Sequence, residues 1–196
     1  MDMKDQNRCS WAGSDPVMIE YHDKEWGVPV HDDTELFEFL VLEGAQAGLS
    51  WSSILNRREG YRKAFVKFDV QKVSIFSEID YERLVQNPGI IRNKLKIKSA
   101  VSNAKQFIRI QEEYQSFDQY LWKFVDFQSI QNRFKTLSEI PAFTDLSKTL
   151  SKDLKRRGFS FVGPTICYAY MQSIGMVNDH LTDCFRYDEI NELSKQ

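Results

Sequence analysis

The chain has 196 residues, 42% of them hydrophobic and 13% aromatic, which is enough apolar material for one domain or two small lobes. Its formal net charge of −2 excludes a global basic field, so any nucleic-acid binding has to be local. Three cysteines exclude a disulfide framework. The longest apolar run, near Leu36–Leu42, is too short to cross a bilayer, and Met1–Arg8 lacks a signal-peptide pattern. We therefore expect a cytoplasmic protein with no membrane partner.

Helical patterns dominate the chain, and they rest on the spacing of apolar residues together with capping and stop signals. Asp32 and Glu35 resemble a capping box, and Ser50 is a second expected N-cap. Asn87-Pro88-Gly89 is a break. The segments expected to be helical are 15–22, 36–47, 50–65, 69–76, 80–86, 90–108, 117–125 and two helices between about 145 and 175.

Strand patterns are weak throughout, and residues 126–143 hold no clear period, so we expect an irregular connection there. The predicted class is all-α, with many short helices at varied angles rather than a simple bundle. Residues 1–8 are expected to be a loose tail, and residues 1–196 to form a single helical unit or two lobes.

The stretch 145–175 is typical of two helices joined by a tight hairpin. Leu146–Leu154 has leucines at i, i+4 and i+8, and Gly158 follows them as a helix stop. A second helix starts with Pro164 in its first turn, and Gly175 ends it. Backbone N–H groups at such a helix start can hold a phosphate.

A basic stripe leads into this hairpin. Its members fall at i, i+4, i+7 and i+8: Lys148, Lys152, Lys155 and Arg156. The stripe is either the solvated face of two packed helices or a surface that binds the DNA backbone, and the residues alone leave both interpretations open.

Two cysteine–histidine pairs stand near opposite ends of the chain: Cys9 and His22, then His180 and Cys184. The second pair has one-turn helical spacing, so we expect both side chains on one helix face. Two thiolates and two imidazoles make a closed tetrahedral zinc set of the structural type, which leaves no open position for a catalytic water. Such a set ties distant parts of the chain together. From the spacing alone, four unrelated residues are the alternative.

Glu43 is an anomaly, because it lies three residues after Leu40 and seven after Leu36, on the apolar face of its helix. An ionised carboxylate there needs a cationic or hydrogen-bonding partner, which is either a buried Arg or Lys or a ligand. The following segment 44–50 ends the helix and carries Leu49 at its tip, which either wedges into a base stack or belongs to the core.

Aromatic residues gather near Glu43 in the sequence: Trp11, Tyr21, Trp26 and Trp51. Several aromatics with one carboxylate suit a flat cationic ligand, through stacking, cation–π attraction and charge pairing. A tryptophan-rich core is the alternative.

Five separated segments together resemble one family, the constitutive bacterial DNA-3-methyladenine glycosylase I enzymes of the helix-hairpin-helix glycosylase superfamily. The resemblance extends from Cys9 to Cys184. The segments, in order, are Tyr21–Pro29, Leu42–Trp51, Gly89–Arg92, Gly158–Gly163 and Val177–His180.

The resemblance implies one structural zinc per chain at the four Cys and His residues, and a helix-hairpin-helix fold whose termini the zinc ties together. It implies that Glu43 is the catalytic and recognition carboxylate. The implied substrate-binding residues are Tyr21, Trp26 and Trp51, with Trp11 close by and Met18 at a position where the family usually has tyrosine. The implied DNA contacts are Gln46, Gly48, Leu49, Lys152, Lys155, Gly163 and Thr165.

The implied activity is flipping and hydrolytic excision of 3-methyladenine from alkylated double-stranded DNA by a monomer, with the free base as product. Asn178 stands where the superfamily has a catalytic Asp, and Thr165 where its lyase members have a Lys. The enzyme is therefore expected to be monofunctional, without strand cleavage. The alternatives are a non-catalytic helix-hairpin-helix DNA-binding module and a zinc-dependent hydrolase, which a zinc with four protein ligands excludes.

Overall fold

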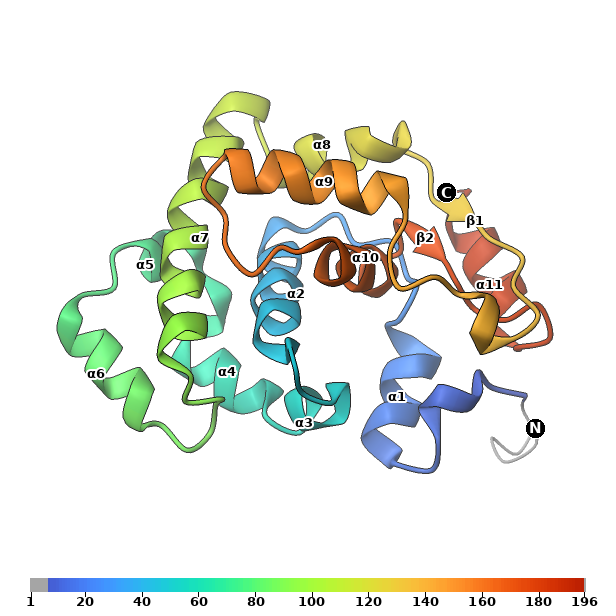
Figure 1. Ribbon diagram of the computed structural model, residues 1–196, viewed down its shortest axis with the longest axis horizontal. Coiled ribbons are helices and arrows are strands. Elements are labelled where there is room, and N and C mark those ends of the chain that lie inside the picture. Colours follow the sequence, from blue (N-terminus) through green and yellow to red (C-terminus); the bar gives the residue numbers. More distant parts are fainter. Residues whose placement is uncertain (1–6, 196) are drawn as a thin grey trace.

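The computed structural model describes residues 7–195 and is mostly helical, which confirms the all-α prediction at that level (Figure 1). Four 3-10 turns and one pair of two-residue strands join the α-helices. The α-helices are α1 (Pro16–Lys24), α2 (Asp33–Gln46), α3 (Trp51–Leu55), α4 (Arg58–Ala64), α5 (Val70–Ser74), α6 (Glu78–Gln86), α7 (Lys94–Tyr114), α8 (Phe117–Trp122), α9 (Asp145–Arg156), α10 (Pro164–Ser173) and α11 (Arg186–Leu193). The other elements are η1 (Ser10–Ala12), η2 (Val66–Phe68), η3 (Lys123–Val125), η4 (Leu137–Glu139), β1 (Ile130–Gln131) and β2 (Val177–Asn178).

Helix α2 runs through the middle of the molecule, between α7 on one side and α10 on the other (Figure 1). Its ten successive residues Leu36–Ala45 are all buried, as expected for a helix that is apolar on nearly every side. Asp32 caps its start by accepting hydrogen bonds from the N–H groups of Thr34 and Glu35. Only Glu38 and Glu43 break the apolar run.

Two predicted helices have different bounds in the structure. The helix expected over 50–65 is split at Asn56 and Arg57 into α3 and α4. The long helix expected from Ile90 begins at Lys94, because the Asn93 side chain accepts the N–H groups of Leu95 and Lys96 and fixes the helix start there.

The connection at 126–143 is irregular, as predicted, but it contains β1 and η4. Strand β1 pairs in parallel with β2, with Ile130 opposite Val177. Two residues are too few to form an alternating strand pattern, so this pairing has no local signal in the sequence.

The expectation of a helix through His180 and Cys184 is wrong, because the chain turns there before α11 begins at Arg186. The Thr182 N–H instead donates to the Phe134 carbonyl, at 2.9 Å. A spacing of four is also compatible with a turn, so the two side chains still approach each other.

The connection between α9 and α10 is held in a defined shape. Gly158 and Phe161 have φ values of +93° and +57°, so the turn uses the left-handed region twice. The Asn103 side chain exchanges two hydrogen bonds with the Ser160 backbone, both 2.9 Å long. The Ser151 hydroxyl donates to the Val162 carbonyl at 2.6 Å. The turn is therefore braced from both α7 and α9.

The predicted loose tail falls partly on residues 1–6, which lie outside the described residues. Its last two members are not loose: the Asn7 side chain donates to the Asp183 carbonyl, and Arg8 pairs with Asp23 at 2.8 Å. The helices described between residues 7 and 195 include none that combines the length and hydrophobicity of a membrane crossing.

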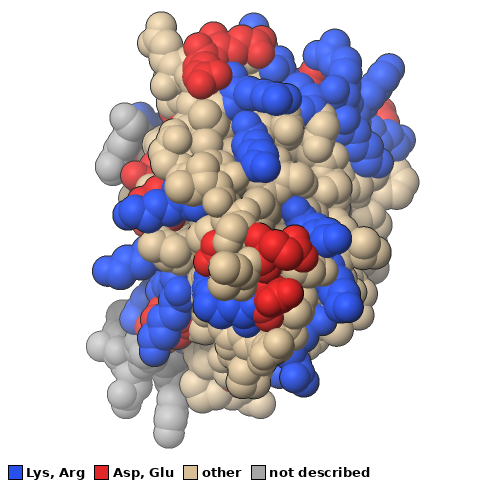
Figure 2. Space-filling model, turned by 90° about the vertical axis from the view of Figure 1, so that its left-hand side faces the viewer, with Lys and Arg blue, Asp and Glu red and all other residues tan. Residues whose placement is uncertain are grey.

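Charged side chains are mixed over the face that carries α5, α6 and α7. Figure 2 shows basic groups on this face that are separated by acidic and neutral atoms, with no continuous positive field. This mixture agrees with the net charge of −2.

Candidate functional site

A pocket of about 320 Å³ opens where α1, α2, α3 and α10 meet η1 and η4, and its size lies within the usual range for a small-molecule site. The structure places Glu43 and all five predicted substrate-binding residues in its wall. The lining residues are Trp11, Met18, Tyr21, Trp26, Glu43, Gln46, Trp51, Leu137, Ile140, Ala169, Gln172 and Ser173.

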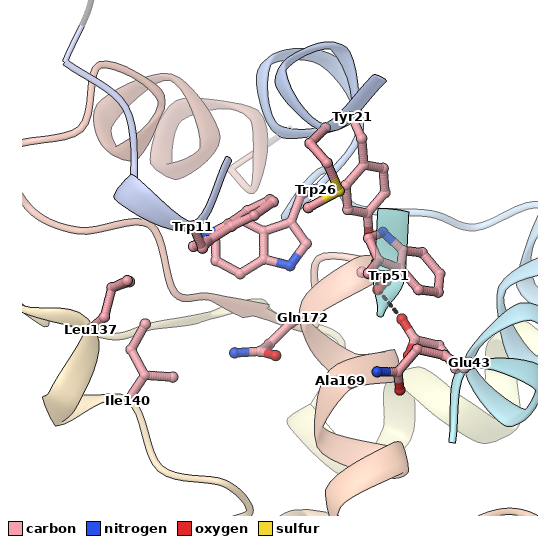
Figure 3. Close-up of a pocket in the computed structure, with 12 residues that line it drawn as sticks. Trp11, Tyr21, Trp26, Glu43, Trp51, Leu137, Ile140, Ala169 and Gln172 are labelled. Carbon is pink, nitrogen blue, oxygen red and sulfur yellow. Dashed lines mark hydrogen bonds between the residues drawn. The ribbon is translucent and has the colours of Figure 1, made fainter. Parts of the chain in front are cut away.

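Glu43 is only 3% exposed, and its partner is a neutral hydroxyl rather than a cation. The Ser173 hydroxyl donates to Glu43 Oε1 at 2.6 Å, and the Tyr21 hydroxyl donates to the Ser173 oxygen at 2.9 Å (Figure 3). Burial raises the pKa of Glu43 to about 7, and the Ser173 hydrogen bond opposes part of that rise. Within residues 7–195, no Lys or Arg pairs with Glu43, so a buried structural cation does not explain this carboxylate.

The aromatic residues form two groups around the pocket (Figure 3). Tyr21 and Trp51 lie near Glu43 with ring centroids 5.5 Å apart, and Trp11 and Trp26 meet edge-on at 4.9 Å. The indole N–H groups of Trp11 and Trp51 are buried, and neither has a hydrogen-bond partner in the described part of the chain. Buried donors are usually paired, so these two indole N–H groups are exceptions within the wall of the pocket.

Several lining residues escaped the sequence analysis. Ser173 and Gln172 lie at the end of α10, and nothing in the sequence marks them as pocket residues, because Glu43, the partner of Ser173, is 130 residues away. Leu137 and Ile140 lie in the aperiodic connection, where no pattern marks a side chain as inward-facing. Ala169 is a small residue within α10, and nothing in the sequence distinguishes it from other small helical residues.

The loop after α2 carries the predicted DNA contacts Gln46, Gly48 and Leu49 in a fixed conformation. Gln46 Nε2 donates to the Leu49 carbonyl at 2.8 Å, and Gly48 has a φ of +77°. Lys96 Nζ, from α7, donates to the carbonyls of Ala45 and Ala47 at 2.8 and 2.6 Å, which satisfies the end of α2. Leu49 is left 39% exposed at the tip, close to the pocket residue Gln46.

The predicted contacts on α9 and α10 lie on the surface. Lys152 and Lys155 are exposed and have no ion-pair partner in the described chain, whereas Lys148 and Arg156 pair with neighbouring aspartates. Gly163 is the N-cap of α10, and Thr165 is exposed in its first turn.

The α9–α10 turn also touches the helix that carries Glu43. A Cβ added at Gly44 would lie 3.4 Å from the Phe161 side chain, so the turn passes close to this residue of α2. Two adjacent residues of α2 therefore reach both places: Gly44 lies against the turn, and Glu43 lines the pocket.

The four predicted metal ligands converge although they come from opposite ends of the chain. Their ligand atoms lie within 4.8 Å of one another, and all four residues are buried. The Cys184 sulfur lies 3.4 Å from His22 Nε2 and 3.6 Å from His180 Nδ1. The outer ring nitrogens are hydrogen-bonded to Asp23 Oδ1 and the Trp26 carbonyl, so the inner ring nitrogens face the cysteine sulfurs. The donor set thus fits a tetrahedral metal ion.

Asn178 does not reach the pocket. Its Nδ2 donates to Gln131 Oε1 and the Tyr187 carbonyl, and its Oδ1 accepts the His180 N–H. The side chain is completely buried, and both its amide nitrogen and its oxygen are hydrogen-bonded to the surrounding chain. Its role in the structure is therefore to hold these segments together.

Comparisons with known proteins agree with this geometry. A family described as methyladenine glycosylase matches residues 11–187. The chain is 49% identical over 180 residues to DNA-3-methyladenine glycosylase 1 of Escherichia coli (strain K12), which covers 92% of this chain and 96% of the relative. It is 46% identical over 177 residues to DNA-3-methyladenine glycosylase of Haemophilus influenzae, with coverage of 90% and 96%.

Solved structures give the same result. A crystal structure of 3-methyladenine DNA glycosylase I superposes with a TM-score of 0.89 at 49% identity, over 91% of this chain and 98% of the other. The enzyme from Staphylococcus aureus, solved to explain its recognition of 3-methyladenine, also gives 0.89, at 36% identity over 92% and 96%. The chain belongs to the methyladenine glycosylase family.

Proposed function

We propose that this protein is a DNA-3-methyladenine glycosylase that flips the alkylated nucleotide out of double-stranded DNA and hydrolyses its glycosidic bond. The proposal rests on Glu43, a buried carboxylate inside an aromatic pocket that pairs with no Lys or Arg among residues 7–195. The names of its relatives support the same substrate.

The alkylated base carries the positive charge that would pair with Glu43. Adenine methylated at N3 has both N3 and N9 fully bonded while it is in DNA, so it carries a fixed positive charge. That charge attracts the Glu43 carboxylate and lowers the cost of ionising it. Tyr21 and Trp51 provide faces for stacking on the flat base.

The chemistry needs little acid catalysis, because the departing base becomes neutral when the bond breaks. The electron pair of the C–N bond leaves with the base, and water adds to the sugar carbon and loses a proton to the solvent. The enzyme's part is to hold the flipped base in place. Once the base is neutral its attraction to Glu43 weakens, which favours product release. Thr165 has no amine for a Schiff base with the sugar, so we propose base removal without strand cleavage.

We assign DNA binding to a helix-hairpin-helix formed by α9, the 157–163 turn and α10. The free backbone N–H groups at the start of α10 and the unpaired Lys152 and Lys155 suit phosphates, which they would bind without regard to sequence. Leu49, at the braced tip after α2, would fill the gap left by the flipped nucleotide.

We assign a structural zinc to Cys9, His22, His180 and Cys184. The donor types, their burial and the hydrogen bonds on the outer histidine nitrogens support zinc. Four protein ligands leave no open position, so the metal would tie the two ends of the chain together and take no part in base excision.

The test is to incubate the protein with methylated duplex DNA and to separate released bases by chromatography. We expect free 3-methyladenine to accumulate while the DNA strands stay intact until they are heated with alkali. Duplex binding without any released base would instead assign the chain to the non-catalytic DNA-binding modules.

A further inference from the structure

Gln172 lines the pocket next to Ser173, the residue that donates to Glu43. The Gln172 side chain extends from α10 into the space below Trp26 (Figure 3). Its Nε2 donates to Asp179 Oδ2 at 2.7 Å. The amide therefore has one end tied to the protein and the other end in the pocket wall.

Asp179 fixes which end of the amide points where. This carboxylate is 1% exposed and accepts hydrogen bonds from Asn132 Nδ2 at 2.6 Å and from the Tyr168 hydroxyl at 2.6 Å, in addition to Gln172. Both Asp179 oxygens already accept hydrogen bonds from other residues, so a flipped Gln172 amide would set its oxygen against a carboxylate oxygen. The nitrogen must face Asp179, and Oε1 is left without a donor in the described chain.

We infer that Gln172 Oε1 is a second hydrogen-bond acceptor for the flipped base, and that Asp179 is the residue that positions it. The inference rests on the proposed function. The exocyclic amine is the only N–H group of N3-methyladenine in DNA, and it has two hydrogens. Glu43 accepts one and Gln172 accepts the other.

This arrangement makes Gln172 a determinant of specificity. A purine with an oxo group in place of the amine would bring its oxygen against the Gln172 and Glu43 oxygens, and the unpaired acceptors would reject it. Gln172 needs no charge to do this, because Asp179 behind it holds the amide in one orientation.

The test variant is Gln172→Met, which keeps the chain length and removes the amide, and the matched control is Tyr168→Phe. The Tyr168 hydroxyl donates to the same Asp179 Oδ2, but Tyr168 does not line the pocket. For each protein, calorimetry gives the Kd of free 3-methyladenine and of 3-methylhypoxanthine, its oxo analogue, and single-turnover assays give the excision rate. Melting curves and metal content report on the fold.

We expect Gln172→Met to weaken 3-methyladenine binding about fivefold to tenfold and to reduce the preference for the amine over the oxo base. Tyr168→Phe should leave the preference unchanged. If Gln172→Met melts early, Gln172→Leu takes its place in the same assays. Unchanged affinity and preference would overturn the inference, as would slower excision with unchanged base affinity. A parent protein that neither binds nor releases 3-methyladenine would overturn the proposed function itself.

Discussion

Burial of Glu43 makes the free energy of unfolding depend on pH. Its pKa rises from 4.5 to about 7 in the folded chain, so the folded state binds more protons than the unfolded state between those values. The free energy of unfolding therefore has its full value below pH 4.5, falls as the pH rises towards 7, and is constant above that. The whole shift corresponds to about 3 kcal/mol.

Glu43→Gln removes this titration while keeping the side-chain shape. We expect the variant to be more stable than the parent at pH 8, by about 1–3 kcal/mol, with a difference that shrinks towards zero near pH 5. Urea denaturation between pH 5 and 8 measures it, and Glu35→Gln is the control, because Glu35 lies exposed on the same helix. A Glu43→Gln curve parallel to that of the parent would show that Glu43 does not titrate in this range.

At the scale of residues, the sequence marked the carboxylate but not its surroundings. Glu43 stood out because a charge on an apolar helix face is locally visible. Ser173 did not stand out because its contact with Glu43 spans 130 residues, and no local pattern places the Gln172 side chain in the pocket. Met18 lines the pocket as the family pattern implied, although its exact contact with a ligand has no local signature.

At the scale of elements, the α9–α10 hairpin carries charges that can be changed without disturbing its packing. Lys152 and Lys155 are exposed and unpaired, so reversing both charges should leave the helix intact. We expect Lys152→Glu with Lys155→Glu to weaken duplex binding on all sequences alike and to reduce the salt slope of log K by about 2. Fluorescence titrations at several salt concentrations measure this.

The control for that pair is Lys63→Glu with Lys67→Glu. These two lysines are also exposed and unpaired in the described chain, but they lie on α4 and η2. The variant changes the net charge by the same amount but outside the hairpin, so it should affect DNA binding much less. Equal losses from both pairs, or a loss confined to particular sequences, would remove the hairpin from the DNA interface.

Helix ends were predicted well where local capping and stop residues mark them. The signals around α9 and α10 are glycine, proline and a leucine row, which act through local backbone conformation, and these helices were predicted within a few residues. The break at Asn56 and the turn at 180–184 were missed, because apolar spacing continues through the first and helical spacing mimics the second. The β1–β2 pair depends on contacts between distant segments and has no local pattern.

At the scale of the molecule, the Cys–His cluster joins the two ends of the chain and also supports the pocket. The His180 ring packs edge-on against Trp26 at 4.6 Å, and His22 meets Trp11 at 5.3 Å. Both tryptophans line the pocket. A metal bound by these histidines would therefore stabilise the chain ends and one aromatic wall of the pocket together.

Loss of the metal should be visible in both places. We expect Cys184→Ala, or treatment with a strong chelator, to release about one zinc per chain and to lower the Tm by about 10 °C or more, with a change in tryptophan fluorescence. Cys167→Ala is the control, because Cys167 is buried outside the cluster. Metal-free parent protein with unchanged melting would contradict a structural metal. The spacing of the four ligands was visible in the sequence, but their convergence needed the whole fold.

The role of Glu43 is tested most directly by the single-turnover rate of 3-methyladenine release from methylated duplex DNA by the parent and by Glu43→Gln. We expect Glu43→Gln to release the base about ten to a hundred times more slowly, because it loses a charged hydrogen bond to a cationic base. Its metal content and duplex affinity should match those of the parent. A variant that releases 3-methyladenine at the parental rate and binds the free base equally well would make Glu43 a structural carboxylate and would contradict the account.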